Sequence, residues 1–148
     1  MQEVLCKFQY LNLFIILLTS FYQYSLMNIL KHPFLDGYAL LSMVSTKDGL
    51  NIILVKYKRY TIGTVAFRRE DGCGDFGNII YVDDVTVEDE YQRKGIGRMM
   101  MELVIYIATQ EKRDIVLAST TWAIPFYHKL KFRRIADSSN RMVYRVKS

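Results

Sequence analysis

Two glycines separated by one residue lie in a basic stretch, QRKGIGR, at residues 92–98. Because glycine has no Cβ, the backbone at Gly95 and Gly97 can approach a ligand closely and offer it N–H groups. An apolar pattern typical of a helix follows. The amino end of a helix attracts anions through its unpaired N–H groups and its dipole. The stretch therefore predicts a loop that binds phosphate, with an ordinary solvated basic turn as the alternative.

Two common kinds of phosphate loop do not fit this stretch. A Walker A loop needs Lys-Ser or Lys-Thr after its last glycine, whereas Arg98 and Met99 follow Gly97. A Rossmann fingerprint needs a third glycine, and that position is occupied by Met100. A different class of phosphate ligand, or of binding loop, is therefore expected.

Elements that could position this loop follow from hydrophobic periodicity and turn residues. Strands are expected at residues 2–8, 50–56, 60–68, 79–87, 114–119, 132–136 and 142–146, and helices at residues 10–19, 21–31, 98–110 and 122–130. The strand 79–87, the helix 98–110 and the strand 114–119 form a βαβ unit, whose strands should pair in parallel. The order predicts one α/β (α+β) domain over residues 1–148, a mixed sheet covered by helices.

Two local features refine these elements. Residues 71–78, DGCGDFGN, are rich in glycine and predict a hairpin loop between two strands. The last helix should be capped by Thr120 or Thr121, with Pro125 tolerated in its first turn.

Composition limits the classes of function. With 51% hydrophobic and 24% charged residues, the chain is typical of a globular protein. A net charge of +5 suits a polyanionic small ligand, and no nucleic-acid-binding motif is present. Two separated cysteines, Cys6 and Cys73, and only two histidines make a disulfide framework and a metal centre unlikely. A reducing, cytoplasmic location is expected.

Residues 8–30 contain no charged side chain and include the apolar run LNLFIILL. A spanning helix needs about 20 predominantly apolar residues. Polar residues interrupt this segment, and no small-residue cleavage site follows it. Two buried helices divided near Thr19 are therefore expected, with association to a membrane through residues 8–30 as the alternative.

The loop resembles the [QR]-x-x-G-x-[GA] motif of the GNAT superfamily of acyl-CoA-dependent N-acyltransferases. A second stretch, AIPFYHKLKF at residues 123–132, is similar to that family's A-x-x-F-Y-x-K-x-G-F signature, with Lys131 in place of the usual glycine. The order and spacing of the two motifs agree, over roughly residues 60–135. The resemblance implies the GNAT fold, in which a mostly antiparallel mixed sheet contains a splayed parallel strand pair and is flanked by helices.

The same resemblance implies roles for individual residues. Loop residues would hold the pyrophosphate of acetyl-CoA, the co-substrate: Gln92, Arg93, Lys94, Gly95, Ile96, Gly97 and Arg98. Val85 and Val87, on the strand before the loop, would pair with the pantetheine arm, and the N–H of Val87 could polarise the thioester carbonyl. No metal is implied.

Two side chains are candidates for the chemistry itself. Tyr127 matches the family tyrosine that serves the leaving thiolate, and a phenol with a pKa of about 10 suits that task. Without the family match, a buried core tyrosine would be preferred. Asp83 is the candidate for holding the acceptor ammonium and accepting its proton. By strand alternation Asp83 shares a face with Tyr81, whereas Asp84 points the other way.

The resemblance implies a primary amine as the acceptor. The segment VDDVTVEDEYQRKGIG and the later IPFYHKLKF are similar to glucosamine-6-phosphate N-acetyltransferases. That subfamily carries an acid and a cysteine where this chain has Ala118 and Ser119, so another small amine or a peptide amine remains open. A non-catalytic acyl-CoA-binding domain is a further alternative. No nucleic acid partner is expected, and a homodimer is an alternative to a monomer.

Overall fold

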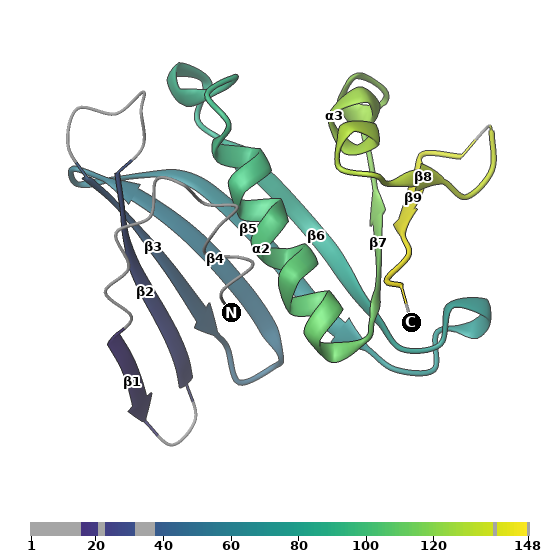
Figure 1. Cartoon of the computed structure of the whole chain (residues 1–148), viewed down its shortest axis with the longest axis horizontal. Helices are drawn as coiled ribbons and strands as arrows, with labels where there is room; N and C mark the ends of the chain where they lie inside the picture. The colour runs from purple at the N-terminus through teal and green to yellow at the C-terminus, as the bar shows by residue number, and fades with distance from the viewer. Residues whose placement is uncertain (1–15, 21–22, 32–37, 138, 148) are drawn as a thin grey trace. The chain divides into compact units, whose positions relative to one another are not determined.

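The computed structural model describes residues 16–20, 23–31, 38–137 and 139–147 (Figure 1). The chain forms two compact units. The N-terminal unit comprises Met1–Ala66 and Val85–Gly97, and the C-terminal unit comprises Phe67–Asp84 and Arg98–Ser148. Whether they form one domain, as the sequence predicts, stays a prediction.

An antiparallel meander builds the N-terminal unit. Its strands follow one another in the sheet in chain order: β1 (Ile16–Ser20), β2 (Gln23–Lys31), β3 (Tyr38–Ser45), β4 (Leu50–Tyr57) and the start of β5 (Tyr60–Glu70). Buried and less buried side chains alternate along β4, where Ile53 and Val55 are fully buried. This alternation places one face of the strand in the core.

The helices expected at residues 10–19 and 21–31 are wrong wherever the structure describes this segment. Residues 16–20 and 23–31 are the strands β1 and β2, which pair with each other in antiparallel register. β2 also pairs with β3, in a region to which the sequence pattern assigns no element. A short apolar run suits a buried helix and a buried strand equally well, and pairing with a neighbouring strand decides between them. The strand expected at residues 2–8 lies outside the described residues.

The C-terminal unit contains the predicted βαβ arrangement. Its elements are the end of β5, β6 (Ile79–Val87) as far as Asp84, α2 (Ile96–Glu111) from Arg98, β7 (Asp114–Ala118), α3 (Ile124–Lys129), β8 (Arg133–Arg134) and β9 (Arg141–Tyr144). β6 and β7 pair in parallel from Ile79 with Asp114 to Val82 with Leu117. The predicted parallel pair is therefore confirmed, as is the α+β class with a mixed sheet and flanking helices.

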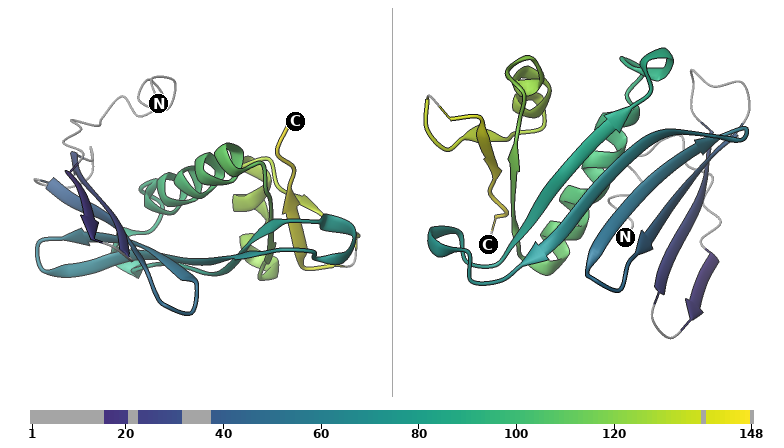
Figure 2. Two further views of the ribbon diagram at one scale, coloured as in Figure 1. Left: turned by 90° about the horizontal axis from the view of Figure 1, so that it is seen from below. Right: turned by 180° about the vertical axis from the view of Figure 1, so that it is seen from behind.

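One face of α2 packs into the core of this unit. Its fully buried side chains recur at helical spacing, at Met100, Met101, Val104 and Ala108. Two views show α2 running along the strands of the C-terminal unit (Figures 1 and 2). A smaller cluster contains Ile79, Val116 and Val143, from β6, β7 and β9.

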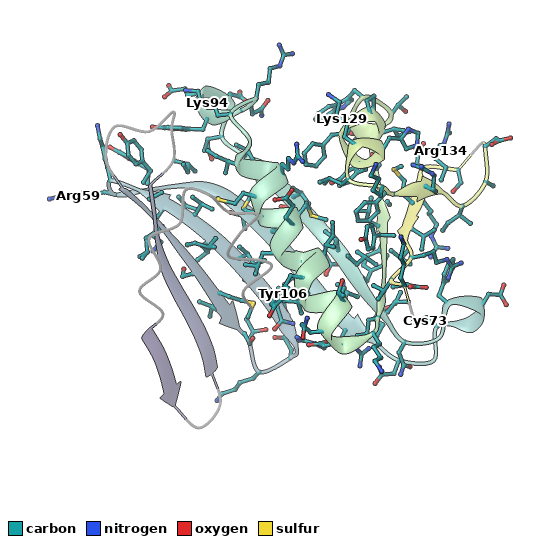
Figure 3. The ribbon with its side chains drawn as sticks, viewed as in Figure 1. Arg59, Cys73, Lys94, Tyr106, Lys129 and Arg134 are labelled. Carbon is teal, nitrogen blue, oxygen red and sulfur yellow. The ribbon has the colours of Figure 1, made fainter. Side chains whose placement is uncertain are left out.

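The turns agree with the glycine-rich composition. Residues 71–78 connect β5 to β6 and contain a short 3₁₀ helix, Gly74–Phe76. Cys73 lies in this connection (Figure 3), with its Sγ 3.5 Å from Glu70 Oε2.

No side-chain hydrogen bond caps the 3₁₀ turn Thr121–Ala123 or α3, so the expected threonine cap is absent here, while Pro125 does lie in the first turn of α3. Among the described residues, no helix has the length and apolar character needed to cross a membrane.

Candidate active site

The predicted phosphate loop lies at the end of the N-terminal unit, between β6 and α2. A 3₁₀ turn, Asp89–Tyr91, precedes it, and Gln92 is extended. The Gln92 side-chain amide donates to Val87 O at 2.9 Å and to Asp89 Oδ1 at 3.0 Å. These two bonds tie the start of the loop to the end of β6. Gln92, the first of the predicted loop residues, is therefore hydrogen-bonded to the end of β6, the strand that contains Val85 and Val87.

Left-handed backbone conformations bend the loop toward α2. Gly95 has a φ of 84°, which glycine adopts at no steric cost, and Arg93 has a φ of 59°. Gly97 does not have positive φ and lies in the first turn of α2, whose first residue, Ile96, is buried. Gly95 is thus required for the turn, whereas Gly97 leaves the helix terminus without a side chain.

Aromatic packing anchors the loop within its unit. The ring of Tyr91 meets the ring of Tyr57 edge to face, with centroids 6.0 Å apart. Lys94 Nζ lies 5.6 Å from the centroid of the Tyr91 ring, and Figure 3 shows Lys94 on the loop that precedes α2. A cation held over an aromatic ring keeps its charge available at the loop.

The donor set of this loop suits a phosphate ester. It combines a glycine-containing turn, the amino end of a long helix and the exposed cation Arg93. Arg98, the first residue of the C-terminal unit's part of α2, forms an i,i+4 pair with Glu102 at 3.0 Å and remains 68% exposed. Among the residues described, no cluster of side chains could hold a metal ion.

In the C-terminal unit, β6 and β7 stop pairing before β6 ends. The last paired residues are Val82 and Leu117. On its other edge β7 pairs with β9 from Ile115 as far as Ala118 with Arg141, and the N–H of Ser119 donates to Asn140 O at 2.8 Å. Asp83 and Asp84 therefore follow the last residue that β7 pairs with, at an open end of the parallel pair.

Asp83 forms a two-pronged ion pair with Arg68 of β5. The Arg68 Nη2 lies 2.6 Å from Oδ1, and Nε lies 3.0 Å from Oδ2. Paired in this way, Asp83 raises the pKa of the Arg68 guanidinium. The role predicted for Asp83 toward an acceptor stays a prediction, with Arg68 now identified as a competing partner.

Tyr127 is buried in α3, with 8% of its surface exposed. Its ring meets those of Phe126 and Phe132 at centroid distances of 5.0 and 5.6 Å. Burial, and then the negative charge of Asp84, raise the pKa of Tyr127 to about 12. The phenol is therefore protonated at neutral pH, as a proton donor must be.

Sequence reasoning did not select Asp84, the carboxylate that acts on Tyr127. Strand alternation separates Asp84 from Asp83, and the sequence prediction gave the acceptor role to Asp83. The signal in the sequence was Arg68. It lies on strand 60–68, which is expected beside strand 79–87, so its guanidinium could pair with one of the two adjacent acids.

Comparison with known proteins extends these observations. A family model described as acetyltransferase (GNAT) domain matches residues 48–134. An uncharacterized N-acetyltransferase of Bacillus subtilis, CgeE, is 32% identical over 71 residues, which cover 43% of this chain and 27% of that protein. The chain thus matches about a quarter of the length of that curated relative.

Solved structures share the fold. Arabidopsis thaliana NAA60 in complex with a bisubstrate analogue superposes with a TM-score of 0.58 at 15% identity, over 67% of this chain and 76% of that one. The Bacillus subtilis N-acetyltransferase YlbP in complex with coenzyme A gives a TM-score of 0.55 at 13% identity, over 64% and 66%. The KacTA–DNA complex gives 0.59 at 15% identity, over 67% and 69%. At these identities the likeness establishes the fold alone.

Proposed function

Because the chain belongs to the acetyltransferase (GNAT) family, we propose that it transfers the acetyl group of acetyl-CoA to a primary amine. The observation that carries this proposal is the loop before α2. Gly95 makes the turn, Gly97 leaves the first turn of α2 without a side chain at that position, and the loop also carries basic side chains. A solved neighbour of the same fold is in complex with coenzyme A.

Residues of the N-terminal unit would bind the co-substrate. N–H groups of the loop and of the first turn of α2 would donate to the pyrophosphate, and Arg93 and Lys94 would add charge. The edge of β6 at Val85 and Val87 would align the pantetheine arm. When bound, acetyl-CoA supplies an activated acyl group in thioester linkage.

Tyr127 would give its proton to the departing sulfur. Its pKa of about 12 keeps the phenol protonated at every physiological pH. A thiolate that has begun to leave is a far better hydrogen-bond acceptor than a thioester sulfur, so the interaction would form mainly in the transition state. Alignment of the two reactants would supply much of the remaining acceleration, on the order of 7–11 kcal/mol in favourable systems.

The acceptor is proposed as an amine on a small molecule or a peptide. Resemblance to glucosamine-6-phosphate N-acetyltransferases supports an aminosugar phosphate, but Ala118 and the buried Ser119 replace the acid and cysteine of that subfamily. Arabidopsis thaliana NAA60 and Naa50 are in complex with bisubstrate analogues, the latter with CoA-Ac-MVNAL, and this supports a peptide amine.

A panel of acceptors tests the activity. The purified chain would be incubated with acetyl-CoA and aminosugar phosphates, polyamines or peptides with free amino groups, and free thiol would be measured against an amine-free control. We expect thiol release with one class of amine and an equal amount of acetylated product by mass spectrometry. Binding of acetyl-CoA in calorimetry without turnover of any amine would instead support the non-catalytic alternative.

A further inference from the structure

The hairpin between β4 and β5 brings a lysine to the predicted phosphate loop. Lys58 lies at the tip of this hairpin, and its Nζ is 5.2 Å from the centroid of the Tyr57 ring. The Tyr57 ring meets the Tyr91 ring with centroids 6.0 Å apart, and Lys94 Nζ lies 5.6 Å from the Tyr91 centroid. Two packed tyrosines therefore carry one ammonium group from the hairpin and one from the loop, all within the N-terminal unit.

The side chain of Lys58 is open to an anionic ligand. It is exposed, and within the described part of the chain it forms no ion pair with a carboxylate. Its φ of 57° is a left-handed conformation that is costly for an L-residue and free for glycine. Glycine would therefore suit this turn better, and what lysine adds at the position is its long cationic side chain.

A cavity of about 620 Å³ adjoins the two tyrosines. Its walls are the start of β5, at residues 60–62, and the segment before the loop, at residues 88–91, which includes Tyr91. A hydrogen bond of 2.9 Å from the N–H of Glu88 to Ile62 O joins the two walls. Sites for small molecules commonly measure about 300–1,000 Å³, so this cavity has the size for a ring system such as a nucleobase.

The walls of the cavity favour a flat, uncharged group over a phosphate. The ring of Tyr60 is 72% exposed and offers a face on which a base can stack. Glu88, Asp89 and Glu90 line the opposite wall, where their carboxylates would repel a phosphate and accept a hydrogen bond from an amino group. Adenine is flat and carries such an amino group. A phosphate attached to the same nucleoside is then expected on the side of the lysines.

From this arrangement we propose that Lys58 binds the 3′-phosphate of acetyl-CoA and that the adjoining cavity binds its adenine. The proposal rests on the proposed acetyltransferase function and names a further binding site for the co-substrate. The pyrophosphate and the 3′-phosphate of coenzyme A are esters of one ribose. A molecule whose pyrophosphate lies on the loop beside Lys94 therefore presents its 3′-phosphate only one sugar away, within reach of the flexible Lys58 side chain.

Calorimetry on the full chain with two ligands tests the role of Lys58. Acetylated dephospho-coenzyme A lacks only the 3′-phosphate of acetyl-CoA. Because an exposed cation on a phosphate dianion gives a modest gain, we expect the wild type to prefer acetyl-CoA roughly 5- to 20-fold. Lys58→Gly should lose most of this preference, and its affinity for the dephospho ligand should equal that of the wild type. This substitution relieves the left-handed backbone, so the fold is retained.

Lys112→Gly is the matched control. Lys112 is also exposed and has a φ of 55°, so the same substitution removes the same charge from the same backbone conformation, in the other unit. This variant should keep the preference of the wild type to within about twofold. An undiminished preference in Lys58→Gly, or an equal loss in both variants, would overturn the proposal. Equal binding of both ligands by the wild type would also overturn it, whereas binding of neither ligand would overturn the proposed function as well.

Substitutions of Tyr60 test the adenine site. Tyr60→Ala removes the exposed ring and should weaken acetyl-CoA and the dephospho ligand equally, roughly 5- to 20-fold, because both contain adenine. Acetylated 4′-phosphopantetheine has no adenine and should bind both proteins with the same affinity. Tyr60→Phe keeps the ring and should bind all three ligands as the wild type does. Unchanged affinity of Tyr60→Ala for acetyl-CoA, or an equal loss for the ligand without adenine, would show that the base does not lie in this cavity.

Discussion

At the scale of single residues, Tyr127 combines burial with a titratable hydroxyl. Replacing it in Tyr127→Phe removes only that hydroxyl and keeps the ring contacts with Phe126 and Phe132. If the phenol protonates the departing sulfur, kcat should fall about 10²- to 10⁴-fold, with the affinity for acetyl-CoA nearly unchanged. Thiol release measured at fixed times gives kcat, and calorimetry gives the affinity for acetyl-CoA. Equal kcat in the variant and the wild type would assign the proton to water or to another group.

Tyr127 also predicts a pH dependence of stability. Its pKa is raised from 10.0 in the unfolded chain to about 12 in the fold. Between these values the folded protein binds more protons than the unfolded chain, so the free energy of unfolding must fall as pH rises from about 10 to about 12. Below pH 10 the contribution of this group is fully present.

Chemical denaturation at a series of alkaline pH values measures this effect. The Tyr127→Phe variant lacks the group and serves as the control for the other tyrosines. Its stability should decline less steeply than that of the wild type over the same interval. Parallel curves for the two proteins would contradict a raised pKa at Tyr127.

At the scale of elements, the first turn of α2 is the part of the loop most open to a decisive test. Gly97 is helical and has no positive φ, so a valine there costs little in backbone strain. Its side chain would nevertheless occupy the space into which the helix terminus presents its N–H groups. Gly97→Val should therefore abolish measurable binding of acetyl-CoA in calorimetry while the fold is retained.

Thr109→Val provides the matched control in the same helix. Thr109 is exposed near the carboxyl end of α2, where its hydroxyl donates to Ile105 O at 2.7 Å. This variant also places a valine in α2 and should bind acetyl-CoA as the wild type does. Undiminished affinity in a folded Gly97→Val protein would exclude the proposed phosphate site.

The elements also show what could be predicted from sequence and why. Strand 79–87 was predicted with the correct ends, and the parallel pairing with β7 followed from the right-handed βαβ rule. The N-terminal strands could not be predicted in the same way. In residues 16–31 the apolar residues fit a helix as well as a strand, and only the pairing of β1 with β2 and of β2 with β3 resolves the choice.

The same distinction between local pattern and tertiary pairing applies to the candidate site. Residues 92–97 were found because a turn, two glycines and a helix start are local properties of sequence. Asp83 pairs with Arg68, and the charge of Asp84 contributes to the raised pKa of Tyr127; both partners lie 15 or more residues away along the chain. Contacts of that range are set by the packing of strands and helices rather than by local pattern.

At the scale of the whole molecule, the net charge of +5 should assist the capture of an anionic co-substrate. Exposed charges interact over a Debye length of about 10 Å at 0.1 M salt and about 3 Å at 1 M. The affinity for acetyl-CoA should therefore weaken steadily between low and high salt. Calorimetry at several sodium chloride concentrations measures this, and an affinity independent of salt would show that the basic residues play no part in binding.

Lys131 carries the α3-to-β8 connection in a left-handed conformation, with φ at 74°, where the similar family signature has glycine. An L-residue holds this conformation at a cost of about 1–2 kcal/mol, which glycine avoids. If stability alone were under selection, evolution would favour glycine over lysine at this position. If close relatives keep lysine at this position despite its cost, the positive charge of Lys131 is under selection. The sequences of such relatives would therefore show whether that charge has a function.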